Sequence, residues 1–206
     1  GKVQVWDQHG GLRAGWSAHE APVASVCFSP DGEHVLTAGW DATARLWDRD
    51  GKMLAALQGH DSRVLAASFS PDGESLITAT EDYSAKVWDT GTLRLVRVLE
   101  GHKQLVSRVA FTPNGQLLIT GSDDGAVKIW AAHTGRLLWE LGAHEGEILD
   151  LETSADGRLL LTTGADKTAR IWDLQLESRT PQELAARLRC RLLHRIEGEA
   201  LVPAAP

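Results

Sequence analysis

The stretch GHDSRVLAASFSPDGESLITATEDYSAKVWD, residues 59–89, decides the fold of this chain. It contains three short runs rich in β-branched and apolar residues, VLAASF, SLITAT and SAKVWD. Between the first two runs, Pro71, Asp72 and Gly73 are the residue types that tight turns favour. An acidic turn at Glu81 and Asp82 separates the second run from the third. The stretch therefore predicts strands joined by short turns.

The same pattern recurs along the chain at a nearly constant distance. Tryptophans recur after 41, 41, 42 and 42 residues, and histidines after 41, 42 and 42. In each repeat the histidine precedes an aspartate by 22 residues, a threonine lies four before that aspartate, and the tryptophan lies six after it. A further run, such as LRLVRVLEGH at 93–102, precedes the histidines. Four short strands per repeat form one blade of a β-propeller, whereas a helical repeat would need a 3.6-residue period that is absent here.

These residues resemble the WD-repeat family. The triplets QGH and EGH, the turn FSPDG and the strand end VWD carry the resemblance, which covers roughly residues 1–174. It implies an all-β, WD-type β-propeller, with about four to five blades present as a partial ring. Ala131 after Trp130, and Thr153 where other repeats have phenylalanine, depart from the pattern. We divide the chain into a partial blade at 1–17, repeats at 18–58, 59–100, 101–142 and 143–174, and a tail at 175–206.

The charge and the hydrophobic pattern of the chain argue against nucleic-acid and membrane partners. The net charge of −7 is unfavourable for binding a nucleic-acid backbone. No apolar run reaches the roughly 20 residues that span a bilayer, so we expect no membrane partner. The two cysteines, Cys27 and Cys190, provide no disulfide framework. This favours a reducing compartment and predicts a cytoplasmic protein.

The start of the chain has the pattern of an interior segment. Gly1 is not a methionine, and GKVQVWD at 1–7 already resembles the end of a strand. We therefore expect the chain to be the C-terminal part of a longer protein. A partial ring exposes two apolar blade faces, so we expect upstream repeats of the same protein, or a second copy, to close it.

The tail has the pattern of a helix. Thr180 suits an N-cap, Pro181 the first helical position, and Glu183 completes a capping box. Leucines then recur every four residues from Leu184, which predicts a short amphipathic helix near 181–194 and no fourth strand in the last blade. We expect the helix to pack on the last blade, with binding of a partner as the alternative. Similar tails close some bacterial WD-repeat proteins, including ones fused to kinases or signalling ATPases.

The recurring polar residues could indicate a metal site, a catalytic relay or a structural network. A zinc site needs several ligands at one point, and each blade has one such histidine. A Thr–His–Asp relay would be present four times, which does not suit an enzyme. The WD resemblance implies instead a hydrogen-bonded network in each blade, so we expect no catalytic residue, metal or cofactor. The predicted networks are Trp47–Thr37–His19–Asp41, Trp88–Thr78–His60–Asp82, Trp130–Thr120–His102–Asp124 and Trp172–Thr162–His144–Asp166.

In this family the loops from the fourth to the first strand and from the second to the third commonly bind partners. Carried over to this chain, they contain the residues that follow each histidine and precede each turn aspartate. Trp40 lies outside the repeated tryptophan register and suits an interaction hot spot, with folding over its own blade as the alternative. The mixture of arginine and acids favours a polar or basic peptide. The predicted partner-binding residues are Trp40, Arg63, Leu65, Glu81, Leu105, Asp123 and Glu147.

The sequence thus predicts a non-catalytic scaffold or sensor module that presents its loops to a protein or peptide. The alternative is the regulatory C-terminal part of a larger signalling enzyme, a protein kinase or a nucleotide-hydrolysing ATPase, whose catalytic domain lies upstream. No glycine-rich phosphate loop and no kinase signature occur in the 206 residues.

Overall fold

The structure, a computed structural model, describes residues 1–174, 191–197 and 200–203. These residues form strands and turns, and none of them lies in a helix that could cross a membrane. The strands are β1 (Lys2–Trp6), β2 (Leu12–Ser17), β3 (Val23–Phe28), β4 (His34–Gly39), β5 (Ala44–Asp48), β6 (Met53–Leu57), β7 (Val64–Phe69), β8 (Ser75–Thr80), β9 (Ala85–Asp89), β10 (Leu95–Leu99), β11 (Val106–Phe111), β12 (Leu117–Ser122), β13 (Ala126–Ala131), β14 (Leu137–Gly142), β15 (Ile148–Thr153), β16 (Leu159–Gly164), β17 (Ala169–Asp173), β18 (Arg191–Glu197) and β19 (Ala200–Pro203).

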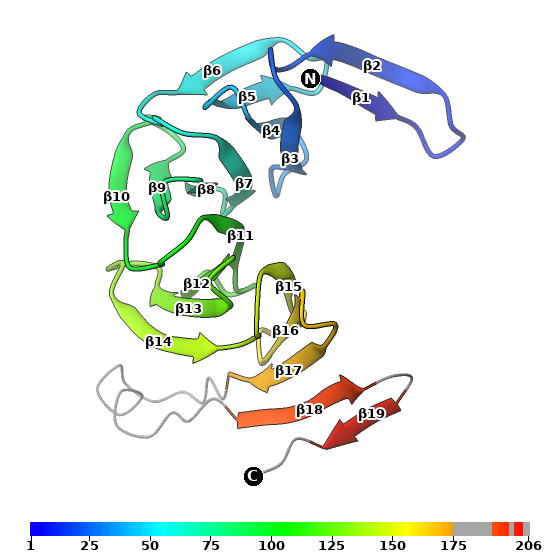
Figure 1. The fold of residues 1–206 in the computed structure, drawn as a ribbon. Helices are drawn as coiled ribbons and strands as arrows, with labels where there is room; N and C mark the ends of the chain where they lie inside the picture. Colours follow the sequence, from blue (N-terminus) through cyan, green and yellow to red (C-terminus); the bar gives the residue numbers. More distant parts are fainter. Residues whose placement is uncertain (175–190, 198–199, 204–206) are drawn as a thin grey trace.

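The strands form blades in chain order. Three four-stranded antiparallel sheets, β3–β6, β7–β10 and β11–β14, are blades 1, 2 and 3. Blade 4 has the five strands β15–β19, and the hairpin β1–β2 precedes blade 1. The blades follow one another around an arc that is open on one side (Figure 1). The all-β, WD-type partial ring predicted from the repeat is therefore confirmed.

The core lies between neighbouring blades. Phe69 at the end of β7 packs in one cluster with Leu36 and Leu46 of blade 1 and is only 8% exposed. Phe111, one repeat later, packs in the same way on Ile77 of blade 2. Each blade thus buries the apolar face that its neighbour presents, which is how repeat proteins are stabilised.

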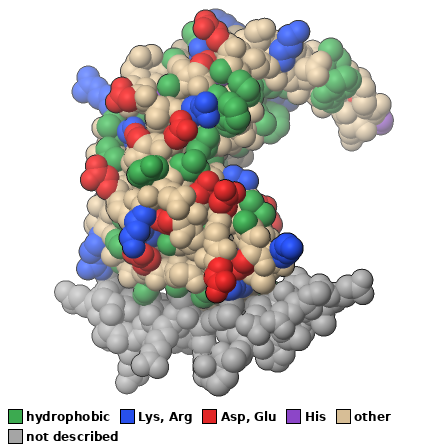
Figure 2. All heavy atoms as spheres, in the orientation of Figure 1, with side chains coloured by type: hydrophobic (Ala, Val, Ile, Leu, Met, Phe, Trp, Pro, Cys, Tyr) green, Lys and Arg blue, Asp and Glu red, His purple; other side chains and the backbone are tan. Residues whose placement is uncertain are grey.

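Both ends of the arc expose apolar side chains. Phe28, the repeat equivalent of Phe69, is 58% exposed because β1–β2 covers only the outer part of this face, through Val3 and Trp16. A cleft of about 990 Å³ lies between the hairpin and the end of β3. At the other end Leu161 is exposed, whereas its equivalent Ile119 is fully buried. The space-filling view shows the hollow on the open side (Figure 2).

The tail differs from the sequence prediction. Residues 191–194, predicted to end a helix, lie in β18, which pairs antiparallel with β17 through Arg191↔Asp173 to Arg195↔Arg170. Blade 4 therefore has a fourth strand, and the prediction that it has only three is wrong. The physical reason is the edge of β17, whose free N–H and C=O groups pair with any extended segment that can reach them. Residues 181–190 of the predicted helix lie outside the described residues.

Candidate functional site

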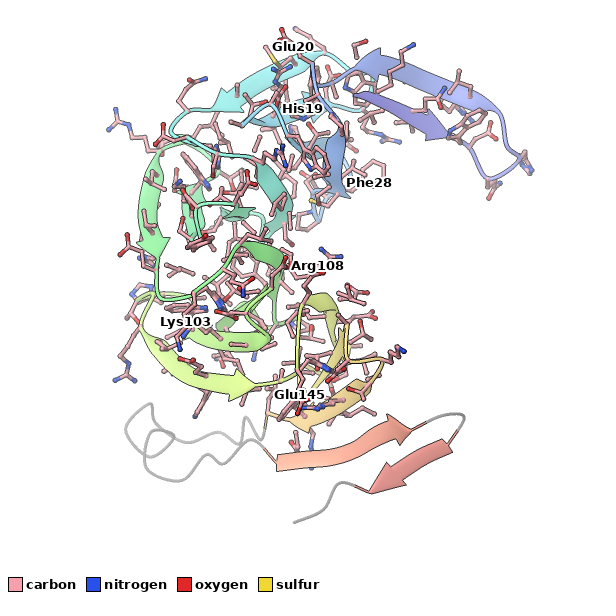
Figure 3. All side chains as sticks on the ribbon, viewed as in Figure 1. His19, Glu20, Phe28, Lys103, Arg108 and Glu145 are labelled. Atoms are coloured by element: carbon pink, nitrogen blue, oxygen red, sulfur yellow. The ribbon has the colours of Figure 1, made fainter. Side chains whose placement is uncertain are left out.

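Blade 1 has a closed polar network beneath two of its loops, the one that leads into β3 and the one that joins β4 to β5. The indole N–H of Trp47 donates to Thr37 Oγ1 at 2.9 Å, and Thr37 Oγ1 lies 2.8 Å from His19 Nε2. His19 Nδ1 lies 2.9 Å from Asp41 Oδ1, whose carboxylate also accepts the backbone N–H of Glu20 at 3.1 Å. His19 and Glu20 lie in the loop that leads into β3 (Figure 3). The network ties that loop to the β4–β5 turn.

Blades 3 and 4 have the same arrangement. His102 Nδ1 lies 3.2 Å from Asp124 Oδ2, and His144 Nδ1 lies 3.0 Å from Asp166 Oδ1. In both blades the histidine Nε2 meets the threonine hydroxyl at 2.8–2.9 Å, and the indole N–H meets the same hydroxyl at 3.0 Å. These side chains are enclosed within single blades, so the geometry gives them a structural role.

Blade 2 departs from the prediction. His60 Nε2 contacts Thr78, and Trp88 donates to the same hydroxyl at 2.9 Å, but Asp82 does not bond to His60. Asp82 instead accepts hydrogen bonds from Thr80, Ser84 and Lys86, the last at 2.9 Å from Nζ to Oδ2. Assigning Asp82 to a fourth closed network is therefore wrong, because its carboxylate faces Thr80, Ser84 and Lys86 and makes no bond to His60.

Burial governs the charge states of these groups. It lowers the pKa of His19 and His102, and it lowers that of His60 to about 4, with Lys86 adding to the effect. For Asp41, burial raises the pKa, but hydrogen bonds from Thr43 and His19 outweigh it and bring the value to about 2. In blades 1 and 3 the network therefore holds a neutral imidazole beside an ionised carboxylate near neutral pH.

The two sets of predicted upper loops meet within each blade. In blade 1 the backbone N–H of Trp40 donates to the Pro22 carbonyl at 3.0 Å. In the other blades the corresponding bonds run from Glu81 to Arg63, from Asp123 to Leu105 and from Ala165 to Glu147, at 2.9–3.1 Å. The residues that the sequence places in two loops thus form one continuous face, which we call the upper face.

The structure brings Trp40, Arg63 and Glu81 together across the junction of blades 1 and 2. The Arg63 guanidinium lies 4.8 Å from the centre of the Trp40 ring, and its Nη1 lies 3.8 Å from Glu81 Oε1. Trp40 remains 45% exposed, so it does not fold down over its own blade. Stacking on the indole and pairing with the carboxylate both restrict the orientation of the Arg63 guanidinium before any partner binds.

The remaining predicted residues lie apart from this cluster. Leu65 is half-buried in β7, Leu105 is half-buried in the loop before β11, and Glu147 is exposed on blade 4. Burial raises the pKa of Asp123, and nearby Glu147 adds to the effect. Arg108 lowers that pKa and also lies 3.8 Å from Asp150, on the inner side of the arc (Figure 3). Sequence reasoning missed Arg108, although the position holds small residues, Ser25 and Ala66, in the first two repeats and charged ones, Arg108 and Asp150, in the last two, which is a usable signal.

The described part of the chain contains no group of three or more His, Cys, Asp or Glu side chains placed to hold a metal ion. What the upper face offers is charge-assisted hydrogen bonding and stacking, both suited to recognition of a polypeptide.

Comparison with known families supports the same assignment. The family model described as WD domain, G-beta repeat matches residues 10–48, 51–89, 93–131 and 135–173. Each match begins two residues before the last strand of one sheet (β2, β6, β10 or β14) and ends with the third strand of the next sheet, so the family repeat is offset from the blade. A comparison with curated protein sequences gave no significant match. WD repeats are generally protein-interaction scaffolds and are typically non-catalytic. The chain belongs to the WD-repeat family.

Proposed function

We propose that this protein is a non-catalytic scaffold or sensor that binds a protein or peptide on its upper face, at the junction of blades 1 and 2. The observation that carries the proposal is the exposed Trp40 with Arg63 stacked on it and Glu81 alongside. Large aromatic and arginine side chains dominate the binding energy of protein interfaces. Arg63 loses little side-chain entropy on binding because Trp40 and Glu81 already hold it.

Several observations favour a polypeptide ligand over a small molecule. The cluster is open to solvent, and its polar groups are spread over loops of two blades. Polypeptides bury such flat, mixed surfaces, whereas small molecules bind in concave and mostly apolar pockets. The acidic composition and the sparse cysteines favour a cytoplasmic protein as the setting, also as a proposal.

The test is selection of binding peptides from a random displayed library, followed by titration of the selected peptides in solution. Trp40→Ala is expected to weaken their binding by at least about tenfold, the loss typical of a hot-spot aromatic. Leu95→Ala, at an exposed apolar residue of outer strand β10, is the control and should bind like the wild type. Peptides that bind Trp40→Ala as tightly as the wild type would show that the proposed face is wrong.

A further inference from the structure

Blade 2 differs from the other blades where its turn aspartate should meet its histidine. In blades 1, 3 and 4 that aspartate accepts the histidine Nδ1 and the N–H of the next residue, which is Glu20, Lys103 or Glu145. Within the described chain Asp82 makes neither bond. Its side chain is 34% exposed, compared with 12%, 9% and 11% for Asp41, Asp124 and Asp166.

The residue two positions before the aspartate explains the difference. Blades 1 and 4 have Gly39 and Gly164 there, and a β-carbon at either glycine would overlap the histidine ring. Blade 3 has Ser122, and its histidine–aspartate distance lengthens to 3.2 Å from 2.9 Å in blade 1. Blade 2 has Thr80, whose branched side chain fills the space and whose hydroxyl donates to Asp82. Blade 2, which has the largest side chain at this position, is the one described blade without the histidine–aspartate bond.

His60 lacks the hydrogen bond to aspartate that the other three histidines make. It is 9% exposed, and its Nδ1 is buried without a partner of normal hydrogen-bond geometry among the described residues. The corresponding atom of His19 points at Asp41. A buried ring nitrogen without such a bond destabilises the fold. The repeat therefore bears a cost at this one blade, next to the cluster of Trp40, Arg63 and Glu81.

The charged side chains around Asp82 differ in how they are paired and how far they are exposed. Arg63 is stacked on Trp40 and paired with Glu81, and Lys86 is buried and paired with Asp82. The Arg63, Glu81 and Asp82 side chains are 50%, 43% and 34% exposed, and Asp61 is exposed in the adjoining loop. Three carboxylates thus lie here beside two cations, and both paired carboxylates remain open to solvent. A carboxylate has about four lone-pair sites, so each can accept further donors.

We infer that Glu81 and Asp82 bind a lysine or arginine side chain of the partner, and that Thr80 is the positioning residue that keeps Asp82 at the surface. The inference rests on the proposed function and specifies the chemistry of its partner. An ammonium or guanidinium that meets two adjacent carboxylates forms charge-assisted hydrogen bonds, which are stronger than neutral ones. The carboxylate that the repeat uses for structure in the other blades is used here for recognition.

The experiment takes peptides that bind the wild type in a Trp40-dependent manner and replaces their lysine by norleucine or their arginine by citrulline. We expect those replacements, Glu81→Gln and Asp82→Asn each to weaken binding by about tenfold, within the usual range for a charged hydrogen bond. Glu74→Gln, at an exposed acid in the β7–β8 turn, is the matched control and should change affinity less than twofold. Glu81→Gln also guards against loss of fold, because the Glu81 side chain is 43% exposed and pairs with the partly exposed Arg63, not with a buried lysine.

Thr80→Ser tests the positioning role through a readout of its own. It gives blade 2 the residue found in blade 3, so the nitrogen NMR spectrum of His60 should change to that of an Nδ1–H donor bonded to Asp82. Affinity for cationic peptides should fall at the same time, while the contribution of Trp40 persists. Trp40-dependent peptides that bind equally well to Glu81→Gln and Asp82→Asn would overturn the inference and leave the proposed function standing. If Trp40→Ala binds like the wild type, both are wrong.

Discussion

The direction of hydrogen bonding sets the protonation of the buried histidines. A carboxylate can only accept, so His19 Nδ1 must donate to Asp41, and Nε2 then accepts from the Thr37 hydroxyl. The same hydroxyl accepts the indole N–H of Trp47. Each closed network is thus a chain of donors that runs from indole to carboxylate, and it holds the imidazole in one neutral tautomer.

Removing the Asp41 carboxylate should show how far the stability of the fold depends on the network in blade 1. Asp41→Ala leaves His19 Nδ1 without its acceptor and should lower the free energy of unfolding by about 1–3 kcal/mol. Asp50→Ala, at an exposed turn residue outside the network, should cost under about 0.5 kcal/mol. Urea unfolding of both variants measures the difference. Equal losses would contradict the structural role given to Asp41.

Acid should destabilise the protein in a defined range of pH. The pKa of His60 is about 4 in the fold and lies near 6.5 in the unfolded chain. Between these values the unfolded chain binds more protons, so the stability held above pH 6.5 is lost as the pH falls towards 4. The linked loss is on the order of 3 kcal/mol for His60. Asp41, with a pKa of about 2, adds a further loss only as the pH falls from about 4 towards 2.

Unfolding midpoints in urea between pH 7.5 and 4.5 measure this loss. His60→Gln, which removes the titrating ring, is the comparison and should flatten the dependence. A profile that is level from pH 7 to pH 5 in the wild type contradicts the assignment.

At the scale of elements, the hairpin β1–β2 is held to blade 1 by an aromatic contact. The rings of Trp16 and Trp47 lie 5.7 Å apart, and Trp16 also lies against Gly51 in the β5–β6 turn. Gly51 has a φ of +86°, which disfavours any residue with a side chain. The position of Trp16 over Gly51 and Trp47 thus gives β2 a specific contact with blade 1.

Two glycine substitutions separate backbone strain from this contact. Gly32→Ala, at φ +71° with open space around it, should cost about 1–2 kcal/mol through the backbone alone. Gly51→Ala bears the same backbone cost and must also displace the Trp16 ring, which adds roughly 1–3 kcal/mol. Thermal unfolding of the two variants measures the difference, and tryptophan fluorescence should change in Gly51→Ala only. Equal costs would mean that the hairpin contact contributes nothing to blade 1.

At the scale of the whole molecule, the open arc exposes surface that its own repeats bury elsewhere. The comparison of Phe28 at 58% with Phe69 at 8% isolates the effect, because the two residues occupy the same place in the repeat. Exposed apolar surface of this kind promotes association.

Residues 1–206 alone should therefore be dimeric or prone to aggregate, and a chain extended by two to four preceding repeats should be monomeric. Phe28→Asp should reduce the association of the short chain, whereas Leu95→Asp on an outer strand should not. Light scattering at several concentrations distinguishes these outcomes. A stable monomer of residues 1–206 would show that the exposed faces need no cover.

Much of the fold can be predicted from the repeat spacing in the sequence. The 41- or 42-residue spacing, the turn residues and the alternating strands determine four-stranded blades, because each feature acts over short distances along the chain. The same spacing places the histidine, threonine and tryptophan of each network in register, since equivalent positions of a repeat share one local geometry.

The differences between equivalent positions of the repeats depend on tertiary structure. Thr80 redirects Asp82 from His60 to the surface because its side chain competes for space and for a hydrogen bond, and only coordinates show that competition. The stacking of Arg63 on Trp40 joins residues of two blades, which no spacing within one repeat specifies. The sequence also did not reveal the pairing of β18 with β17. The unpaired edge that favours a strand at 191–197 belongs to a segment 18 to 25 residues earlier in the chain, and the local pattern is helical.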